Sequence, residues 1–299
     1  MAEKMNQSLK KLALSFGKLI PDKLYIRIYY RKAFGKRLNL KSPVTYNEKI
    51  QWMKLYYRKD MMTKLVDKYE VRKYIADKIG EEYLFPLLGV WDSPEEIDYS
   101  SLPDRFVLKC THDSGSVVVC RDKQSLDRKS VNEKLKKCLK HNWYWNGREW
   151  PYKNVKPRII AEQYMEDESH RELKDYKFFC FDGKPKAFFI ATDRGNENEE
   201  VKFDFYDMDF NHLPFKHGHE WSDKEIKKPL NFDKMIEIAS ELSKGWPHVR
   251  VDLYNIDGKV YFGEMTFSHH CGFVPFEPEE WDYKFGEWLR LPSKQIPVK

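Results

Sequence analysis

The chain has 299 residues, of which 41% are hydrophobic, 15% aromatic and 33% charged. This length suits roughly two domains with a sizeable core, and the composition excludes a disordered or fibrous protein. No run approaches the ~20 consecutive apolar residues of a spanning helix, and the amino terminus lacks an apolar core followed by a small-residue cleavage site, so we expect a cytoplasmic protein.

The net charge of +6 is concentrated at the amino-terminal end. Residues 1–41 carry eleven Lys or Arg against two acids, about +9, which leaves about −3 for the rest. Apolar residues recur at helical spacing over 9–20, and Pro21 ends the pattern. Such a basic amphipathic helix can bring residues 1–20 to an anionic membrane surface or pack on the protein itself. Nucleic acid is not an expected partner, because no reading module follows.

Cysteine and histidine patterns do not predict a metal site. The five cysteines form an odd set without close paired spacing, which fits reduced thiols: Cys110, Cys120, Cys138, Cys180 and Cys271. Two histidine pairs, His217 with His219 and His269 with His270, have no third ligand at a recognisable spacing. Zinc is therefore not expected.

The chain reads as helices first and mainly strands afterwards. Residues 46–79 show helical periodicity that Gly80 ends. Short apolar runs bounded by turn residues then indicate strands at 105–109, 117–120, 158–161, 176–181, 186–192, 249–254 and 260–265. Asp182-Gly183 and Asp257-Gly258 predict two tight hairpins, and helices are expected at 125–140 and 231–244. The plan is α+β, in two lobes.

The last hairpin carries charge on otherwise apolar strands. Alternation sends its polar side chains to one face: Arg250, Asp252, Glu264 and Thr266. Two carboxylates on adjacent strands suit Mg²⁺, which takes oxygen ligands and shares substrate phosphates, and an arginine beside them can clamp a phosphoryl group. A cross-strand salt bridge without metal is the alternative, and the hairpin alone leaves both open.

Three further segments offer groups that suit a nucleotide. Lys109 ends an apolar strand and leads into a small-residue loop, 111–116, whose N–H groups can meet phosphates, although a strand-end lysine is commonly a solvated edge residue. Residues 159–165 are typical of a hinge whose backbone bonds an adenine edge. Asp175 and Lys177 alternate onto one strand face, where they can reach ribose and phosphate.

The order of these features resembles the ATP-grasp superfamily: lysine, flap, hinge, ribose acid, then Arg-x-Asp with Glu-x-Thr. Asp67-Lys68 precedes them, where that superfamily often has an Asp-Lys pair. More narrowly, five motifs look like those of the TupA-like ATP-grasp family: Tyr46-Asn47-Glu48-Lys49, Asp67-Lys68-Tyr69 with Arg72, Trp150-Pro151-Tyr152, Ala161-Glu162-Gln163-Tyr164 and Phe262-Gly263-Glu264-Met265-Thr266-Phe267. The resemblance covers about residues 40–290, and the family is associated with bacterial capsule and other surface polysaccharide clusters.

The resemblance implies a role for each matching position. ATP would be held by its phosphates, adenine and ribose at Lys68, Lys109, Ser114, Gly115, Ser116, Glu162, Gln163, Tyr164, Met165, Asp175 and Lys177. Arg250 and Lys109 would act on the transferring phosphoryl group, and Mg²⁺ would lie on Asp252 and Glu264. Thr266 stands where the superfamily commonly has asparagine as a further metal ligand, and the flap is poorer in glycine than usual.

Two other segments are candidates for binding the second substrate. Ser268, His269, His270 and Gly272 follow the predicted metal strand, and we expect them to position an acceptor rather than to supply a Ser or Cys nucleophile. An aromatic cluster then stands near Arg148 and Lys153: Trp143, Tyr144, Trp145, Trp150 and Tyr152. It can stack on sugar rings or form a packed lobe interface.

These features predict an ATP-grasp fold in which two α+β lobes clasp ATP. We expect a basic helical region at 1–60, a first lobe with the flap at 61–165, and a second lobe with the Mg²⁺ site at 166–299. The expected activity is an ADP-forming carboxylate–amine ligase that works through an acyl phosphate; the resemblance implies a sugar uronate as the acid and an amino acid or amino sugar as the amine. A glycosyltransferase and a non-catalytic ATP-binding protein at the membrane are the alternatives.

Overall fold

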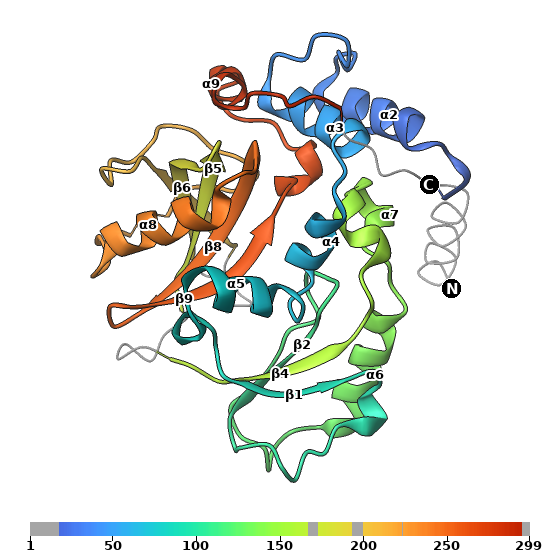
Figure 1. Ribbon diagram of the computed structural model, residues 1–299, viewed down its shortest axis with the longest axis vertical. Helices are drawn as coiled ribbons and strands as arrows, with labels where there is room; N and C mark the ends of the chain where they lie inside the picture. Colours follow the sequence, from blue (N-terminus) through green and yellow to red (C-terminus); the bar gives the residue numbers. More distant parts are fainter. Residues whose placement is uncertain (1–17, 167–172, 193–199, 223, 295–299) are drawn as a thin grey trace.

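The polypeptide folds around two antiparallel sheets, and the computed structural model describes residues 18–166, 173–192, 200–222 and 224–294 (Figure 1). In the view of Figure 1 the first sheet lies at the bottom and the second at the left, with α3 and α9 above. This mixed content confirms the predicted α+β class.

The first sheet has the strand order β1-β4-β2-β3, with every neighbouring pair antiparallel. Its strands are β1 (Leu87–Trp91), β2 (Phe106–Cys110), β3 (Val118–Cys120) and β4 (Ile159–Gln163). Helix α6 (Arg128–Leu139) buries Val131 and Leu135 in one cluster with Phe106 and Leu108. The strands expected near 105–109, 117–120 and 158–161 are confirmed, and so is the helix. Strand β1 was not predicted.

The second sheet has the order β7-β6-β5-β8-β9, again antiparallel throughout. Its strands are β5 (Asp175–Phe181), β6 (Lys184–Thr192), β7 (Lys202–Tyr206), β8 (His248–Ile256) and β9 (Lys259–Thr266). Both predicted hairpins form, and Asp182 and Asp257 adopt φ of 47° and 51° in their turns. Only β7 was not predicted. Helix α8 (Phe232–Ser243), which was, packs on β5, β6 and β8.

One face of this second sheet changes from aromatic to charged along its length. Pairs across β5 and β8 run in this order: Phe181 with His248, Phe179 with Arg250, and Lys177 with Asp252. The aromatic end is covered by α3 (Tyr46–Tyr56) and α9 (Glu280–Trp288), whose Tyr46 and Phe285 rings contact Phe179. Arg250 therefore marks the boundary between a closed core and a polar end.

The helical region expected at 46–79 is present as three helices, α3, α4 (Asp60–Val66) and α5 (Val71–Ile79). Their apolar faces join the core of the second sheet rather than that of the first. Helix α2 (Asp22–Phe34) and α9 were not predicted, and most of the predicted helix at 9–20 lies outside the described residues. The remaining short elements are η1 (Glu81–Tyr83), η2 (Pro94–Glu96), α7 (Tyr144–Gly147), η3 (Trp150–Asn154) and η4 (His269–Gly272). Within the described ranges, no helix combines the length and hydropathy needed to cross a bilayer.

The Tyr46-Asn47-Glu48-Lys49 motif joins α3 to α9. Thr45 and Glu48 form a capping box that starts α3. Asn47 N–H donates to Asp282 Oδ1 at 2.9 Å, and Lys49 Nζ donates to the carbonyls of Gly286 and Leu289 at 2.8 and 2.9 Å. A cation at the last carbonyls of α9 also complements the helix dipole. This motif therefore holds α3 and α9 together over the aromatic end of the sheet.

Gly286 is required at the α3–α9 contact. A Cβ at this position would lie 2.3 Å from Val44 O and 2.9 Å from Tyr46 N, which are backbone atoms that cannot rotate away. We predict that Gly286→Ala lowers the free energy of unfolding by about 3 kcal/mol, because the two helices must separate. Urea unfolding measures this loss. The control, Gly35→Ala, has open space around the new methyl and only a φ of 67° to strain it, and should cost about 1 kcal/mol.

Candidate active site

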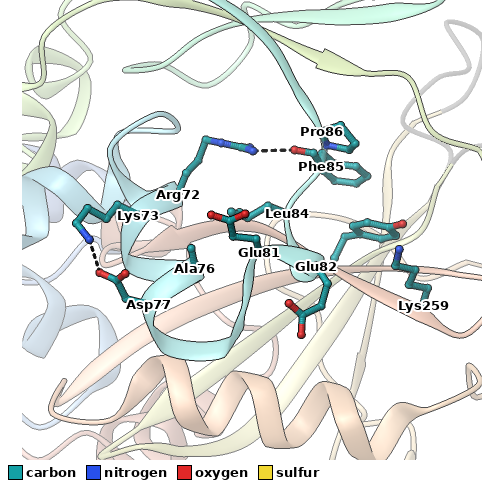
Figure 2. Close-up of a pocket in the computed structure, with 11 residues that line it drawn as sticks. Arg72, Lys73, Ala76, Asp77, Glu81, Glu82, Leu84, Phe85, Pro86 and Lys259 are labelled. Atoms are coloured by element: carbon teal, nitrogen blue, oxygen red, sulfur yellow. Dashed lines mark hydrogen bonds and ion pairs between the residues drawn. The ribbon is translucent and has the colours of Figure 1, made fainter.

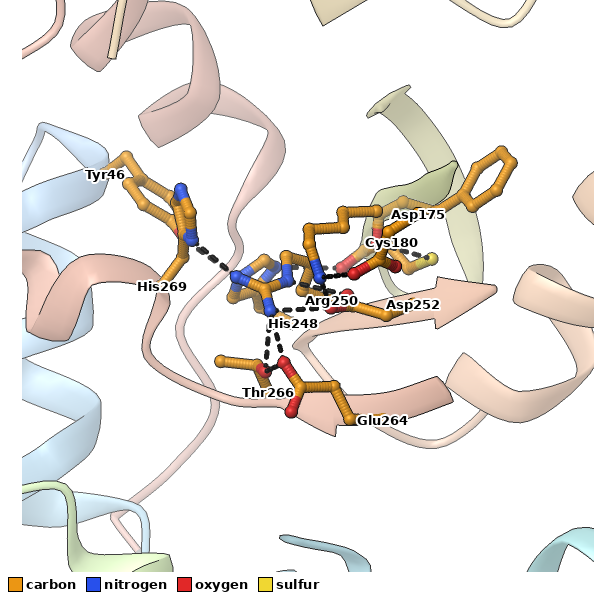
Figure 3. Close-up of polar contacts among 11 residues, drawn as sticks. Tyr46, Asp175, Cys180, His248, Arg250, Asp252, Glu264, Thr266 and His269 are labelled. Carbon is orange, nitrogen blue, oxygen red and sulfur yellow. Dashed lines mark hydrogen bonds and ion pairs between the residues drawn. The ribbon is translucent and has the colours of Figure 1, made fainter. Parts of the chain in front are cut away.

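Arg250 lies at the centre of a charged network on β5, β8 and β9 (Figure 3). Its Nε and one NH2 nitrogen donate to the two oxygens of Asp252, each at 2.7 Å. The same NH2 nitrogen reaches Glu264 Oε1 at 2.8 Å and Thr266 Oγ1 at 3.1 Å. Asp252 is directly opposite Glu264 in the β8–β9 register. The predicted alternation thus brings all four polar side chains of the hairpin together.

Lys177 adds a second cation to this network. Its Nζ contacts Asp252 Oδ2, and it lies 2.5 Å from Asp175 Oδ2. Burial alone would raise the pKa of Glu264, but the charges of Lys177, Arg250 and Lys68 outweigh it and hold that pKa well below the usual range. Glu264 is therefore ionised at neutral pH, and Lys68 lies within electrostatic reach of it.

The oxygen atoms of this network fit a hard divalent cation. Two carboxylates and a hydroxyl face one another on neighbouring strands, and about a third of the Glu264 side chain is exposed, so one carboxylate stays accessible. Mg²⁺ commonly binds one or two protein carboxylates and completes its shell with phosphates and water. No cluster of three or more His, Cys, Asp or Glu suited to a metal occurs in the part of the chain that the structure describes, and a two-carboxylate site is consistent with that.

Lys68 and the flap lie on the first-sheet side. The Lys68 N–H donates to Thr111 O at 3.0 Å, and its Nζ contacts the carbonyl of Asp113. Gly115 has φ 125° and, like Ser114, is exposed. Ser116 differs: its buried hydroxyl accepts from Cys110 N–H at 2.7 Å and donates to Asp113 at 2.5 Å, so it shapes the loop from inside.

Lys109 is not a solvated edge residue. Its Nζ bonds Glu162 Oε2 at 2.7 Å, and the other Glu162 oxygen accepts from Arg72 NH1 at 3.3 Å. The Glu162 side chain is only 10% exposed. The carboxylate predicted for the hinge therefore holds Lys109 in place, whereas Gln163 ends β4 and Tyr164 and Met165 continue beyond it.

An aromatic cluster that the sequence pattern did not predict lies next to the hinge. Phe85 stacks on Tyr261 with ring centroids 4.9 Å apart and contacts Tyr254 at 5.5 Å, and Met165 of the hinge packs on the same cluster. The Lys109 Nζ lies 5.9 Å from the Phe85 ring. This cluster thus joins the two sheets. Tyr254 could have been found, because it continues the alternating row of Arg250 and Asp252.

The loop that is expected to position the acceptor is hydrogen-bonded to Arg250 at His269 and packs against α3 at Gly272. His269 Nδ1 accepts from Arg250 NH1 at 2.6 Å. Gly272 faces α3, since its carbonyl accepts from Gln51 Nε2 at 2.5 Å and a Cβ there would clash with Ile50 and Gln51. Ser268 is buried, and His270 is partly exposed.

The two histidine pairs meet in space although they are far apart in sequence. The ring of His217 lies 5.1 Å from that of His269 and 5.2 Å from that of His270. Burial keeps the pKa of His217 and of His269 well below the usual value, and neighbouring positive charge adds to this effect. These rings are neutral at pH 7 and pack against the aromatic core.

Most of the aromatic cluster at 143–153 forms packed structure. Arg148 is buried, with its guanidinium 4.2 Å from the Tyr25 ring and 4.6 Å from the Trp145 ring, and Trp150 is in the main core. Arg148 thus packs against α2, and Trp150 packs in the core of the second sheet. Tyr152 packs against the same core but remains partly exposed.

A separate surface cavity of about 620 Å³ lies beside α5 and the Phe85–Pro86 segment (Figure 2). Charged side chains such as Lys73, Glu81 and Lys259 border it. None of the predicted site residues lines it. Arg72 is its link to the network, because it donates to Phe85 O at 2.9 Å and reaches Glu162. Side-chain chemistry rather than cavity size therefore locates the candidate active site.

Two α+β lobes that bring lysines, an arginine and paired carboxylates to one place define a protein of the ATP-grasp class. A family model described as TupA-like ATPgrasp matches residues 48–290, and the chain therefore belongs to the TupA-like ATP-grasp family. This match confirms the family and the fold expected from the motifs. A comparison with curated proteins finds no match.

Several solved structures are similar to the chain at low identity. The D-alanine–D-alanine ligase from Bacillus anthracis complexed with ATP is 16% identical, with a TM-score of 0.41 and coverage of 69% of this chain and 57% of that one. The D-cycloserine synthetase DcsG is 16% identical, with a TM-score of 0.40 and coverage of 76% and 69%. The ATP-grasp ligase PsnB is 10% identical, with a TM-score of 0.39 and coverage of 70% and 53%. The chain thus spans little more than half of the first and third of these proteins.

Proposed function

We propose that this protein is an ADP-forming carboxylate–amine ligase that binds Mg·ATP between its two sheets. The observation that carries the proposal is the network around Arg250. It gathers two carboxylates, a hydroxyl and Lys177 on the second sheet, within electrostatic reach of Lys68 from the facing side. Paired carboxylates beside an arginine and lysines are the groups that phosphoryl transfer needs.

The residues divide into a nucleotide set and a transfer set. We assign the phosphates to Lys68, Lys109 and the flap, the adenine to the hinge at 163–165, and the ribose to Asp175. Asp252 and Glu264 would hold Mg²⁺, with Thr266 as a further oxygen ligand. When bound, Mg²⁺ offsets the negative charge of the phosphates.

Arg250 is the residue that must change partners during turnover. A guanidinium has five donors and no acceptor. In the structure, one NH2 nitrogen of Arg250 contacts three acceptor oxygens at once, those of Asp252, Glu264 and Thr266. An anionic γ-phosphoryl group would compete for these donors and would be stabilised as charge develops on it. The cross-strand salt bridge is therefore the resting form of the proposed site, and the two interpretations of this hairpin are compatible.

For the substrates, we propose a sugar uronate as the acid and an amino acid or amino sugar as the amine. This choice rests on the association of the family with surface polysaccharide clusters. The carboxylate attacks the γ-phosphorus and releases ADP; the amine then attacks the acyl phosphate and releases phosphate.

An ADP-release screen tests the proposal. Uronic acids are paired with amino acids and amino sugars in the presence of Mg·ATP, and products are analysed by mass spectrometry. We expect ADP release that needs both partners, and a product mass equal to acid plus amine less one water. Consumption of a UDP-sugar with an uncharged sugar, in place of ATP, would instead identify a glycosyltransferase. ADP release without any adduct would reject the ligase.

A further inference from the structure

Two turns from distant parts of the chain meet beside Arg250. One is the end of α7 at Gly147 and Arg148, and the other is η4, which follows β9. Lys54 of α3 joins them, since its buried Nζ donates to Gly147 O at 2.8 Å and to Cys271 O at 2.7 Å. The η4 turn is itself anchored to the active site through the bond between His269 and Arg250.

The backbone at this meeting point is strained. Arg148, His270 and Cys271 have φ of 58°, 48° and 56°, a left-handed conformation that side chains other than glycine and asparagine rarely adopt. Gly147 is equally constrained, because a Cβ there would lie 2.3 Å from Cys271 Sγ. Strain of this kind persists only where the surroundings enforce it, and it clusters at functional sites.

This arrangement places the carboxylate of Glu149 against the acceptor loop. Cys271 Sγ donates to Glu149 Oε1 at 3.1 Å, and the Glu149 residue is 5% exposed. Burial raises the pKa of this carboxyl, while the hydrogen bond from Cys271 and the charges on Lys54 and Arg250 oppose the rise. A shielded carboxylate with a raised pKa is suited to accept a proton.

Tyr152 lies one turn after Glu149, in η3. The phenol is partly exposed, and its OH forms no hydrogen bond with any residue of the described ranges. Burial raises the pKa of Tyr152, and the charges of Glu149 and Glu264 raise it further while Arg250 lowers it. The Tyr152 N–H donates to Glu149 O at 3.2 Å, and the charges of both Glu149 and Glu264, the carboxylate that we assign to Mg²⁺, act on the phenol.

We infer that Glu149 and Tyr152 form the binding site of the amine acceptor, and that Glu149 takes the proton which the amine loses as the amide forms. This inference rests on the proposed ligase function and deepens it. The ligand class is a primary amine, which enters beside the η4 turn and is oriented by the Tyr152 hydroxyl.

The lone pair of the neutral amine forms a C–N bond with the acyl carbon. The bond from that carbon to the phosphate oxygen breaks, and phosphate leaves with the electron pair. One N–H proton passes to a Glu149 oxygen, which later returns it to water.

Hydroxylamine separates this step from the earlier one, because it is a small nucleophile that is neutral at pH 7 and does not need to be held by Glu149. The full chain is supplied with Mg·ATP and the acid identified by the screen, and ADP release is measured with hydroxylamine or with the natural amine. We expect Glu149→Gln to lower the amine-dependent rate by about 10²- to 10⁴-fold and to change the hydroxylamine-dependent rate less than threefold. Glu133→Gln, at an exposed position of α6, is the matched control.

Tyr152→Phe supplies a second measurement that does not depend on the folding of the first variant. It removes only a hydroxyl that has no hydrogen-bond partner among the described residues, so we expect an unchanged fold, a KM for the amine raised by about tenfold, and an unchanged KM for ATP. Equal losses with hydroxylamine and amine, or no loss with either, would overturn the acceptor site alone. Failure of the unaltered protein to release ADP with hydroxylamine and any acid would overturn the ligase function and, with it, this site.

Discussion

Glu264→Gln is expected to lower ATP-dependent turnover by about 10²- to 10³-fold without unfolding the protein. Glutamine keeps the length of the side chain and an oxygen that can still accept the 2.8 Å bond from Arg250. It loses the negative charge, which Lys177, Arg250 and Lys68 keep on this side chain in spite of burial. A hard cation such as Mg²⁺ depends on that charge.

Three measurements check this result. ADP release at saturating substrates should fall as stated, the Mg²⁺ concentration for half-maximal rate should rise, and urea unfolding should change by less than about 1 kcal/mol, as for most conservative changes at a partly exposed position. Glu287→Gln, at an exposed position of α9, is the control and should behave as the unaltered protein. A preserved rate in Glu264→Gln would remove this residue from the metal site and leave the network as a salt bridge.

The sequence predicts most of the second sheet well because turn residues between neighbouring strands indicate which strands pair. Asp257-Gly258 fixes the β8–β9 turn, and period-two alternation then places Arg250 and Glu264 on one face. The structure adds a bulge next to Asp252, opposite Gly263, whose missing side chain leaves room for Asp252 O and the Tyr254 ring. Strands β1 and β7 were missed for a physical reason: β1 is half-buried along its whole length and shows no alternation, and β7 is a short edge strand.

Contacts between distant segments could not be predicted. Glu149 and Cys271 are 122 positions apart, and nothing in either segment indicates the other. The partner of Lys109 is a similar case, because a strand-end lysine is usually solvated and only the register of β2 with β4 brings Glu162 next to it. Local pattern therefore identified the charged residues, whereas tertiary packing decided which of them are bound to each other.

Stability is expected to fall steeply below pH 6.5 because of buried histidines, three of which pack among the aromatic rings of the second sheet's core. Burial lowers the pKa of His248 to about 3 and keeps those of His217 and His269 well below the usual value. Two of these rings accept a hydrogen bond, which requires a neutral imidazole. His248 donates to Cys180 O at 2.9 Å and accepts from Tyr46, and His269 accepts from Arg250. A proton on the accepting nitrogen would oppose these bonds.

The unfolded chain binds these protons near pH 6.5 and the folded chain does not, so the stability is fully present above pH 6.5 and is lost as the pH falls toward the folded pKa values. At about 1.4 kcal/mol per histidine and pH unit, the three together remove roughly 4 kcal/mol for each unit. Since a domain has about 5–15 kcal/mol to lose, we expect acid unfolding between about pH 3 and pH 5.

Urea unfolding at a series of pH values measures this slope. His217→Gln should reduce it by about one third, because glutamine can still donate to Val274 O, the partner of His217 Nε2 at 3.1 Å, but does not take up a proton. His212→Gln, at an exposed position, is the control and should leave the slope unchanged. A free energy of unfolding that stays level from pH 8 to pH 5 would show that these rings are hydrated or protonated in the folded protein, and the closed aromatic end of the second sheet would then need to open to water.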